Sequence, residues 1–316
     1  LKQKDEFGVY EVGMDKKGEI DKLTKLIKPD LGIITNISYA HSKNFRNIDQ
    51  IAEAKAEIIK NIKKNGIVVL NKDDKFYNFH KNFALKRKLK VISFGIKNKS
   101  STVYLEKIKK TENNYELFIN VDGLLISFYY FNNNTSHMYN ILASLASIFM
   151  FKDIKKLKKD NFLNFKIPNG RGNILKVKLK DRKIFLVDET YNSNPLSLKT
   201  AIENFDKIKL KNSKKYLILG DMLELGKNSL KQHKLISKII NRTKINHVYV
   251  IGKYIKETFK GLKMNKKAKI LNNKSSILDL IYKNLNNNDY LMIKGSNSTG
   301  LHKIITNLKK RNTYVI

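Results

Sequence analysis

The chain has 316 residues, of which 41% are apolar and none is cysteine. This length allows about two domains of ~100–200 residues, the lack of cysteine excludes disulfides and thiolate chemistry, and no run of ~18 apolar residues predicts a membrane-spanning helix. The formal charge of +35 would suit a polyanion partner, but the lysines are spread over nearly every segment instead of forming a stripe, so we expect no specific nucleic-acid partner and no membrane partner.

The first elements predict parallel strand pairing. Residues 7–12 alternate and favour a strand, Glu19–Ile27 has helical spacing and stops before Pro29, and residues 31–37 are again apolar. A strand, a helix and a second strand in this order are typical of a parallel sheet. Further buried strands are expected at residues 67–70 and 91–94.

A helix is predicted from Ile48, with Asn47 as its N-cap and Gln50 three positions later, to a turn at Asn65-Gly66. Lys55 falls on the apolar stripe of this helix, four residues after Ile51. Such a lysine can pack its stem and extend its ammonium to water. It can also be desolvated, with a lowered pKa and a reactive amine.

Over residues 102–131 apolar and polar residues alternate, which predicts strands, and Asn-Val-Asp-Gly at 120–123 predicts a hairpin turn between two of them. An apolar helix over residues 137–151 and a lysine-rich stretch follow, and Ile167-Pro168-Asn169-Gly170 reads as a domain boundary. The fold expected for residues 1–167 is an α/β mononucleotide-binding domain with a parallel sheet and a small antiparallel sheet.

Residues 168–316 predict a second α/β domain, which is Rossmann-like. It opens with a hairpin across residues 180–183 and then alternates strands with helices. Its expected parallel strands lie at residues 216–219, 248–251 and 290–293.

Two phrases rich in carboxylates and amides follow apolar runs in this second domain. They are Asp-Glu-Thr-Tyr-Asn-Ser-Asn-Pro at 188–195 and Leu-Gly-Asp-Met-Leu-Glu-Leu-Gly at 219–226. The carboxyl ends of strands in an open α/β sheet are where ligands bind, so both phrases are candidate binding loops.

These phrases resemble the Mur ligases of peptidoglycan synthesis, and among them the ligases that join D-alanyl-D-alanine to UDP-N-acetylmuramoyl-tripeptide. The resemblance covers nearly the whole chain. It implies an ATP-dependent ligase that works through an acyl phosphate with Mg²⁺, in the cytoplasm and as a monomer. Folylpolyglutamate synthases share this architecture, but the two phrases favour the cell-wall enzymes.

The resemblance also implies a metal site. The family has a Thr-Asn-Ile segment, then Ala-His, then a carbamylated lysine, which correspond here to residues 35–37, His41 and Lys55. Its glutamate ligand corresponds to Glu11. Carboxylate oxygens are ligands that Mg²⁺ prefers, and one histidine beside them is chemically reasonable. Lys55 and His41, together with Arg171, are therefore the expected catalytic residues.

Nucleotide-binding residues carry over in the same way. Asn140, in Ser-His-Met-Tyr-Asn-Ile-Leu-Ala, matches an asparagine that contacts adenine, although the first two positions of that motif differ here. Arg171 matches an arginine that reaches the ATP phosphates, and a guanidinium suits phosphate geometry. Asp188 and Glu189 match an acidic pair near the ribose; Asp188 could instead cap the helix that begins at Pro195.

Substrate contacts are expected from four residues of the second domain, Tyr191, Asn192, Asn194 and Lys294. Lys294-Gly295-Ser296 ends a strand and precedes a helix, where backbone N–H groups favour anions. For Asp221, Glu224 and His233 the resemblance gives no role.

The family's Gly-x-x-Gly-Lys-Thr phosphate loop does not occur in the sequence. The resemblance places this loop, and a domain that grips the UDP-sugar, before residue 1. An inactive fragment or one part of a split ligase therefore remains an alternative, and so does, more distantly, a basic nucleic-acid-binding protein.

Overall fold

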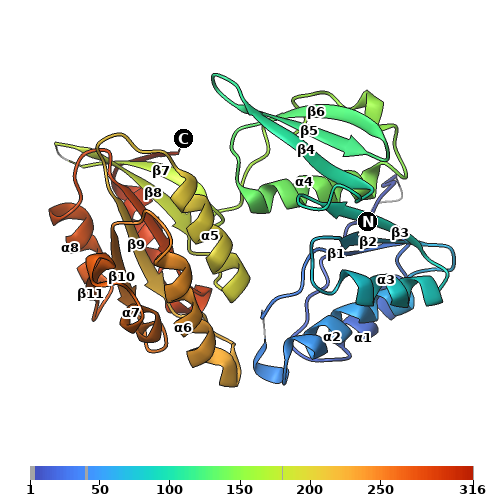
Figure 1. Ribbon diagram of the computed structural model, residues 1–316, viewed down its shortest axis with the longest axis horizontal. Coiled ribbons are helices and arrows are strands. Elements are labelled where there is room, and N and C mark those ends of the chain that lie inside the picture. Colours follow the sequence, from blue (N-terminus) through green and yellow to red (C-terminus); the bar gives the residue numbers. More distant parts are fainter. Residues whose placement is uncertain (1–3, 40–41, 180, 316) are drawn as a thin grey trace. The chain divides into compact units, whose positions relative to one another are not determined.

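The computed structural model describes residues 4–39, 42–179 and 181–315. The chain divides into two compact units (Figure 1). Unit 1 comprises Leu1–Ile37 and Asn44–Phe165, and unit 2 comprises Ser38–Lys43 and Lys166–Ile316. Both are α/β units, so the predicted fold class is confirmed. Among the described residues, no helix combines the length and the apolar character that crossing a bilayer requires.

The sheet of unit 1 joins a parallel and an antiparallel part. Its strands follow the chain order: β1 (Leu31–Ile34), β2 (Ile67–Asn71), β3 (Lys90–Gly95), β4 (Val103–Lys110), β5 (Tyr115–Val121) and β6 (Leu124–Tyr130). The pairs from β1 to β4 are parallel, and β4, β5 and β6 pair antiparallel. The predicted hairpin turn is confirmed, because Asp122 and Gly123 both have positive φ, as a two-residue turn requires.

Helices cover both faces of the parallel strands in unit 1. They are α1 (Glu19–Ile27), α2 (Ile48–Asn61), α3 (Tyr77–Lys86) and α4 (Thr135–Ile148), and α4 lies on the opposite side from the other three (Figure 1). The Asn47 side chain accepts from the Gln50 backbone N–H at 3.0 Å, which confirms the predicted cap of α2. Helix α3 was not expected, because its apolar residues do not follow a clear helical stripe.

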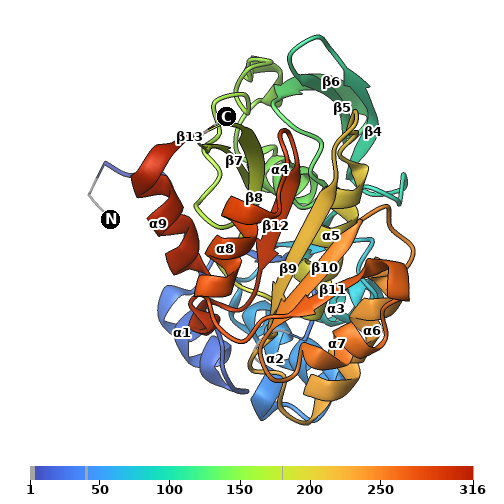
Figure 2. The same ribbon diagram turned by 90° about the vertical axis from the view of Figure 1, so that its left-hand side faces the viewer.

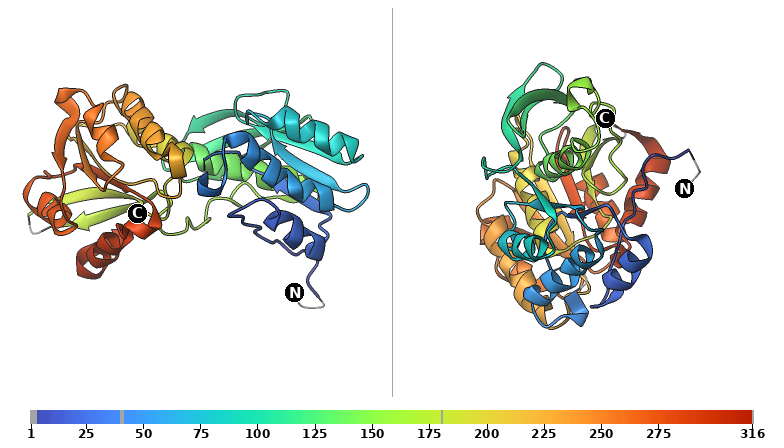
Figure 3. Two further views of the ribbon diagram at one scale, coloured as in Figure 1. Left: turned by 90° about the horizontal axis from the view of Figure 1, so that it is seen from below. Right: turned by 90° about the vertical axis from the view of Figure 1, so that its right-hand side faces the viewer.

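The strand predicted at residues 7–12 is wrong. The described part of the segment before α1 is coil, drawn in dark blue in Figure 3. Phe7, Val9 and Tyr10 are 52%, 95% and 55% exposed. Alternating apolar residues favour a strand only where a neighbouring strand supplies hydrogen bonds and cover, and the described structure pairs no strand with this segment.

Unit 2 is built on a mostly parallel sheet with the strand order β11-β10-β9-β12-β8-β7-β13. The strands are β7 (Asn173–Lys178), β8 (Lys183–Glu189), β9 (Lys215–Gly220), β10 (His247–Ile251), β11 (Lys267–Ile270), β12 (Tyr290–Lys294) and β13 (Thr313–Val315). The β7–β8 hairpin and the parallel strands β9, β10 and β12 confirm the sequence prediction. Because β12 lies between β8 and β9, the loops after these three strands meet at one edge.

Helices cover both faces of this sheet as well. Figure 2 shows α8 (Ser275–Lys283) and α9 (His302–Asn312) on one side, and α5 (Pro195–Lys207), α6 (Ser229–Ile240) and α7 (Lys256–Lys260) on the other. Each side has its own apolar core. Close packing on both faces holds the sheet rigid, and this fixes the strand ends from which the loops begin.

Candidate functional site

A buried ion pair joins the ends of two neighbouring strands in unit 2. Lys294 ends β12 and lies in register with Glu189, which ends β8. The Lys294 Nζ is 3.2 Å from Glu189 Oε2 and donates to the Asn192 carbonyl at 2.9 Å. Burial raises the pKa of Glu189, and the Lys294 ammonium opposes that rise. The structure thus brings together three of the predicted residues at the edge where parallel strands end.

Arg171 and Tyr191 form a second contact at this edge. The guanidinium carbon of Arg171 lies 4.1 Å from the centroid of the Tyr191 ring, which is a cation–π geometry. Gly170 makes the approach possible: its φ is +77°, and a Cβ there would lie 2.7 Å from the Tyr191 nitrogen. The aromatic ring therefore supports an exposed cation that can reach an anion such as phosphate.

Asp188 and Asn194 both make local hydrogen bonds. The Oδ1 of buried Asp188 accepts from the Thr190 backbone N–H at 3.1 Å and from the Thr190 hydroxyl at 2.7 Å. The helix that begins at Pro195 is capped by Asn194, in a capping box with Ser197, so the alternative role of Asp188 as this cap is wrong. The predicted ligand contacts of Asp188 and Asn194 stay predictions.

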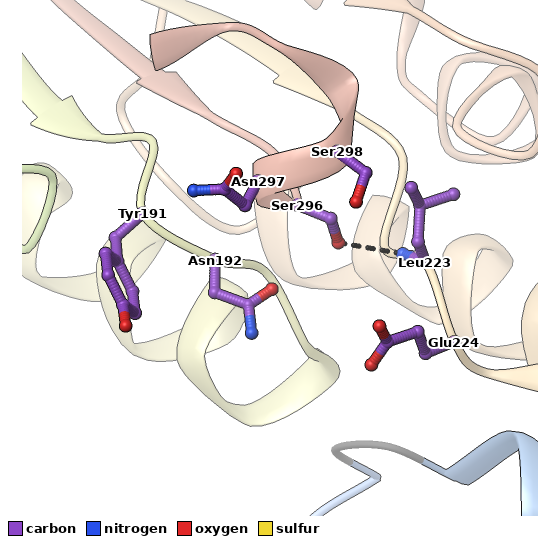
Figure 4. Close-up of a pocket in the computed structure, with 7 residues that line it drawn as sticks. All are labelled: Tyr191, Asn192, Leu223, Glu224, Ser296, Asn297 and Ser298. Atoms are coloured by element: carbon purple, nitrogen blue, oxygen red, sulfur yellow. Dashed lines mark hydrogen bonds between the residues drawn. The ribbon is translucent and has the colours of Figure 1, made fainter. Parts of the chain in front are cut away.

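A cavity of about 190 Å³ opens beside these residues (Figure 4). It is lined by the loops after β8, β9 and β12, through Tyr191, Asn192, Leu223, Glu224, Ser296, Asn297 and Ser298. Tyr191 and Asn192 were predicted, whereas the other lining residues were not. Leu223 and Glu224 belong to the phrase at residues 219–226, and Ser296 ends the Lys294-Gly295-Ser296 segment, whereas Asn297 and Ser298 had no signal of their own. Adjacent parallel strands bring the loops that follow them together.

One hydroxyl ties the three loops to each other. The Oγ of buried Ser296 donates to the Ser193 carbonyl at 3.2 Å and accepts from the Leu223 N–H at 2.8 Å. The Ser296 N–H donates to the Asp221 carbonyl at 3.0 Å. Figure 4 shows the Ser296–Leu223 bond at the back of the cavity. These bonds give the cavity a defined shape before any ligand binds.

His233 and Asp221, for which no role was predicted, hold the phrase at residues 219–226 in place. The Nε2 of His233 accepts from the Met222 N–H at 2.9 Å, so the proton is on Nδ1, which lies 2.6 Å from the Ser229 carbonyl. Burial lowers the pKa of His233 and keeps the ring neutral. The Asp221 carboxylate accepts from the Lys253 and Ile255 N–H groups.

Lys55 lies in the middle of α2 in unit 1 and turns its amine to a backbone carbonyl. Its Nζ donates to the Asn36 carbonyl at 3.0 Å. Burial lowers the pKa of the Lys55 amine, and the Asp74 carboxylate opposes this effect. Only a neutral amine adds to carbon dioxide, so the surroundings of Lys55 fit a carbamylated lysine, whose carboxylate-type oxygens suit Mg²⁺.

The other predicted residues of unit 1 are not joined to Lys55. Glu11 is exposed on the coil before α1, and within the described residues no hydrogen bond or ion pair connects it to Lys55. His41 lies outside the described residues. Within the part of the chain that the structure describes, no group of three or more His, Asp or Glu side chains is placed to hold a metal ion. Asn140 is exposed on α4. The metal set and the adenine contact stay predictions.

Family relationships agree with this architecture. Residues 1–148 match the Mur ligase middle domain, and residues 170–297 match the Mur ligase glutamate ligase domain. The chain belongs to the Mur ligase family. Among the curated proteins, the UDP-N-acetylmuramoyl-tripeptide–D-alanyl-D-alanine ligase of Rickettsia prowazekii is 29% identical over 305 residues, covering 95% of this chain and 66% of that protein. The ligase of the same name from Buchnera aphidicola subsp. Acyrthosiphon pisum is 30% identical over 318 residues, covering 98% and 66%.

Solved Mur ligases share the fold. MurF from Acinetobacter baumannii matches with a TM-score of 0.85 and 21% identity, covering 98% of this chain and 66% of that one. The MurF ligase from Thermotoga maritima in complex with ADP matches with a TM-score of 0.77 and 23% identity, covering 94% and 66%. The Mur ligase chain described here thus spans just under two thirds of the length of these relatives.

Proposed function

We propose that the chain serves ATP-dependent amide bond formation, in which D-alanyl-D-alanine is added to a UDP-N-acetylmuramoyl-tripeptide. The observation that carries this proposal is the similarity to ligases of that name, which runs through both units at 28–30% identity in three relatives. The cavity in unit 2 supports it, because both phrases that suggested this enzyme contribute to its lining.

The reaction has two steps, formation of an acyl phosphate and its attack by the amine. An oxygen of the tripeptide's terminal carboxylate attacks the γ-phosphorus of ATP, the bond from that phosphorus to the bridging oxygen breaks, and ADP leaves. The dipeptide amine then attacks the acyl carbon, inorganic phosphate leaves, and the nitrogen loses a proton. Fixed cations stabilise the charge on the transferring phosphoryl group, and Arg171 on its Tyr191 support is suited to this role.

Nucleotide and cation are assigned to the residues that the family resemblance indicates. Asn140 would contact adenine, Arg171 the phosphates, and Asp188 with Glu189 the ribose. Glu11, His41 and carbamylated Lys55 would hold Mg²⁺, which supplies Lewis-acid stabilisation of phosphate oxygens when bound. Carbamylation joins the neutral Lys55 nitrogen to the carbon of CO2 and releases one proton.

The dipeptide is assigned to the cavity of unit 2. Figure 4 shows the Asn192 amide and the Glu224 carboxylate projecting toward the same space from different loops. A carboxylate with amides and hydroxyls around it suits a small zwitterion, whose ammonium pairs with the carboxylate and whose carboxylate accepts hydrogen bonds. Tyr191, Asn192, Asn194 and Lys294 remain the proposed substrate contacts. We further propose that the enzyme acts as a monomer in the cytoplasm.

The test is a phosphate-release assay on the protein encoded by the complete reading frame that contains these residues. ATP, UDP-N-acetylmuramoyl-tripeptide and D-alanyl-D-alanine are expected to give phosphate and the pentapeptide product, seen by mass spectrometry. Replacing the acceptor and amine by a folate and glutamate tests the folylpolyglutamate alternative. Turnover with that pair alone, or salt-sensitive DNA or RNA binding without any turnover, would contradict the proposal.

A further inference from the structure

Two neighbouring carboxylates follow β2 in unit 1, and no role has been assigned to either. Asp73 and Asp74 lie in the turn between β2 and α3, half-buried, at the carboxyl end of the parallel strands. Each is bonded to a different part of the chain. Carboxylates that are partly withdrawn from water are costly unless they are hydrogen-bonded, so the partners of Asp73 and Asp74 indicate what these residues do.

Asp73 gathers the loop after β3 and the helix α4. Its carboxylate accepts from the backbone N–H groups of residues 96, 97 and 98 at 2.6, 2.9 and 2.9 Å. It also accepts from the Tyr139 hydroxyl at 2.9 Å. Gly95 leaves room for this carboxylate, since a Cβ there would lie 3.2 Å from both of its oxygens.

The Tyr139 bond bears on the nucleotide site because Tyr139 precedes Asn140, the proposed adenine contact. Helix α4 packs through apolar residues such as Met138 and Leu142, and in its first turn the His137 Nδ1 lies 3.0 Å from the Tyr130 hydroxyl. Apolar packing is non-directional, whereas a hydrogen bond to a carboxylate fixes distance and orientation. Asp73, together with the His137 contact in the first turn of α4, thus sets the position of the helical turn that carries Asn140.

Asp74 holds a different segment, the three residues before Ser38. Its Oδ2 accepts from the Ile37 N–H at 2.8 Å, and its Oδ1 accepts from the Phe76 N–H at 2.8 Å. The Asn71 side chain donates to the Thr35 carbonyl at 3.0 Å. Between these two contacts, the Asn36 carbonyl accepts from Lys55. The segment 35–37 is therefore fixed at each of its residues.

We infer that Asp73 and Asp74 are positioning residues that align the two parts of the active centre of unit 1: Asp73 places the Asn140 turn for the nucleotide, and Asp74 places the Asn36 carbonyl for Lys55. The inference rests on the proposed function. A carbamate nitrogen keeps a single hydrogen, so the direction of the Asn36 carbonyl would decide how the carbamate is turned.

Separable kinetic effects test this division of roles. Asp73→Asn and the milder Tyr139→Phe, which keeps the backbone bonds of Asp73, are expected to raise the KM for ATP about tenfold with kcat changed less than about twofold. Asp74→Asn is expected to lower kcat about tenfold with the KM for ATP nearly unchanged. Asn71→Ala frees the Thr35 carbonyl and also the Asp73 N–H, which donates to the Asn71 Oδ1 at 2.9 Å. It should therefore lower kcat by a smaller factor and raise the KM for ATP slightly.

A spectroscopic readout separates positioning from loss of folding. The carbamate carbon is observed by NMR after equilibration with ¹³C-bicarbonate and is normalised to folded protein. Because Asp74→Asn also removes the charge that opposes the lowered pKa of the Lys55 amine, it is expected to keep the carbamate but to shift its ¹³C signal, since the Asn36 carbonyl is no longer held. Asp73→Asn and Tyr139→Phe should leave the signal unshifted. Asp122→Asn and Tyr104→Phe, at the hairpin turn and on β4, are matched controls that should resemble the wild type.

If Asp73 and Asp74 variants changed the same kinetic parameter, or if Asp74→Asn left the carbamate signal unshifted, the inference would be overturned while the proposed function stood. A wild-type enzyme with neither product nor carbamate would refute the proposed function, and the inference with it.

Discussion

Two lysines, one in each unit, are held by different kinds of partner. Lys294 in unit 2 pairs with the Glu189 carboxylate at 3.2 Å, and Lys55 in unit 1 donates to the uncharged Asn36 carbonyl at 3.0 Å. A carboxylate at contact distance stabilises an ammonium, whereas burial beside a carbonyl lowers the pKa of the Lys55 amine. Lys294 is therefore tied to a charged partner, whereas the surroundings of Lys55 favour its neutral, reactive amine.

Removing the Lys55 amine should have the largest effect. Lys55→Ala is expected to lower kcat by about 10³-fold, because several kcal/mol of transition-state stabilisation by the cation are lost. A short carboxylic acid such as acetate should restore part of the activity if a carboxylate-type ligand is what the variant lacks. Lys60→Ala, at an exposed position of the same helix, is the control. Wild-type turnover of Lys55→Ala would defeat the assignment.

Lys294 should matter for stability as well as for ligands. Lys294→Met leaves the Glu189 carboxylate without its ammonium in a buried site, which typically costs about 3–5 kcal/mol of unfolding free energy. Urea unfolding measures this, and adding Glu189→Gln should recover part of the loss. Lys283→Met, which breaks an exposed pair with Asp279, is expected to cost less than about 1 kcal/mol. Equal losses for the two lysines would contradict the contrast.

The same variant has a pH signature. Burial already raises the pKa of Glu189 and Lys294 opposes the rise, so Lys294→Met should raise it further. A carboxyl whose pKa is higher in the folded than in the unfolded state binds more protons when folded, so stability falls as pH rises above the unfolded value of 4.5. The deficit of Lys294→Met should therefore be larger at about pH 8 than at about pH 5. A deficit independent of pH would contradict this.

Arg171 extends the comparison to an exposed cation held by a ring. Arg171→Ala is expected to raise the KM for ATP about tenfold without lowering the melting temperature, because a charged hydrogen bond to phosphate is lost. Tyr191→Leu should raise the KM for ATP about threefold, because the cation–π contact is lost. Tyr191→Phe keeps the ring, so its KM for ATP should stay close to that of the wild type. Arg242→Ala controls for an exposed arginine elsewhere in unit 2. Unchanged KM and kcat in Arg171→Ala would refute its placement.

The smallest expected effect concerns His233, a buried histidine whose ring is kept neutral by burial. Burial lowers the pKa of His233 in the folded state, so the unfolded state binds more protons as pH falls from the usual histidine value of 6.5 toward the folded pKa. Stability is lost in that pH window. His233→Gln, which can still accept from Met222, should reduce this acid loss by about 1 kcal/mol. Chemical unfolding at several pH values measures it. An identical pH slope in variant and wild type would show that His233 does not contribute.

The sequence predicted the elements whose signals are local. Asn47 and Gln50 marked the start of α2, and Asp122-Gly123 marked a hairpin turn, because caps and two-residue turns depend on nearby residues. The strand at residues 7–12 failed for the opposite reason: alternation describes a segment, but a strand also needs a neighbour to pair with. Helix α3 was missed because its stabilisation comes from packing more than from its own pattern.

The part of the candidate site that lies in unit 2 could be predicted in outline, because its residues lie at the ends of parallel strands. Glu189 and Lys294 lie 105 residues apart, yet they are register partners, as strand ends in a parallel sheet can be. Cavity residues such as Glu224 and Ser296 belonged to segments already singled out in the sequence, but only the strand order β9-β12-β8 shows that their loops share one space. The bonds from Asp73 to Tyr139 and from Asp74 to Ile37 carry no sequence signal, since they connect positions 66 and 37 residues apart.

The most direct test of the contrast between the two lysines is to ask whether residue 55 places a CO2-derived carbon beside the bound cation. The enzyme is loaded with Mn²⁺ in place of Mg²⁺ and equilibrated with ¹³C-labelled CO2, and electron–nuclear double resonance measures coupling between the metal and ¹³C. We predict a ¹³C coupling in the wild type that is absent from Lys55→Arg and retained in Lys294→Met. Bound Mn²⁺ without any ¹³C coupling in the wild type would contradict the account.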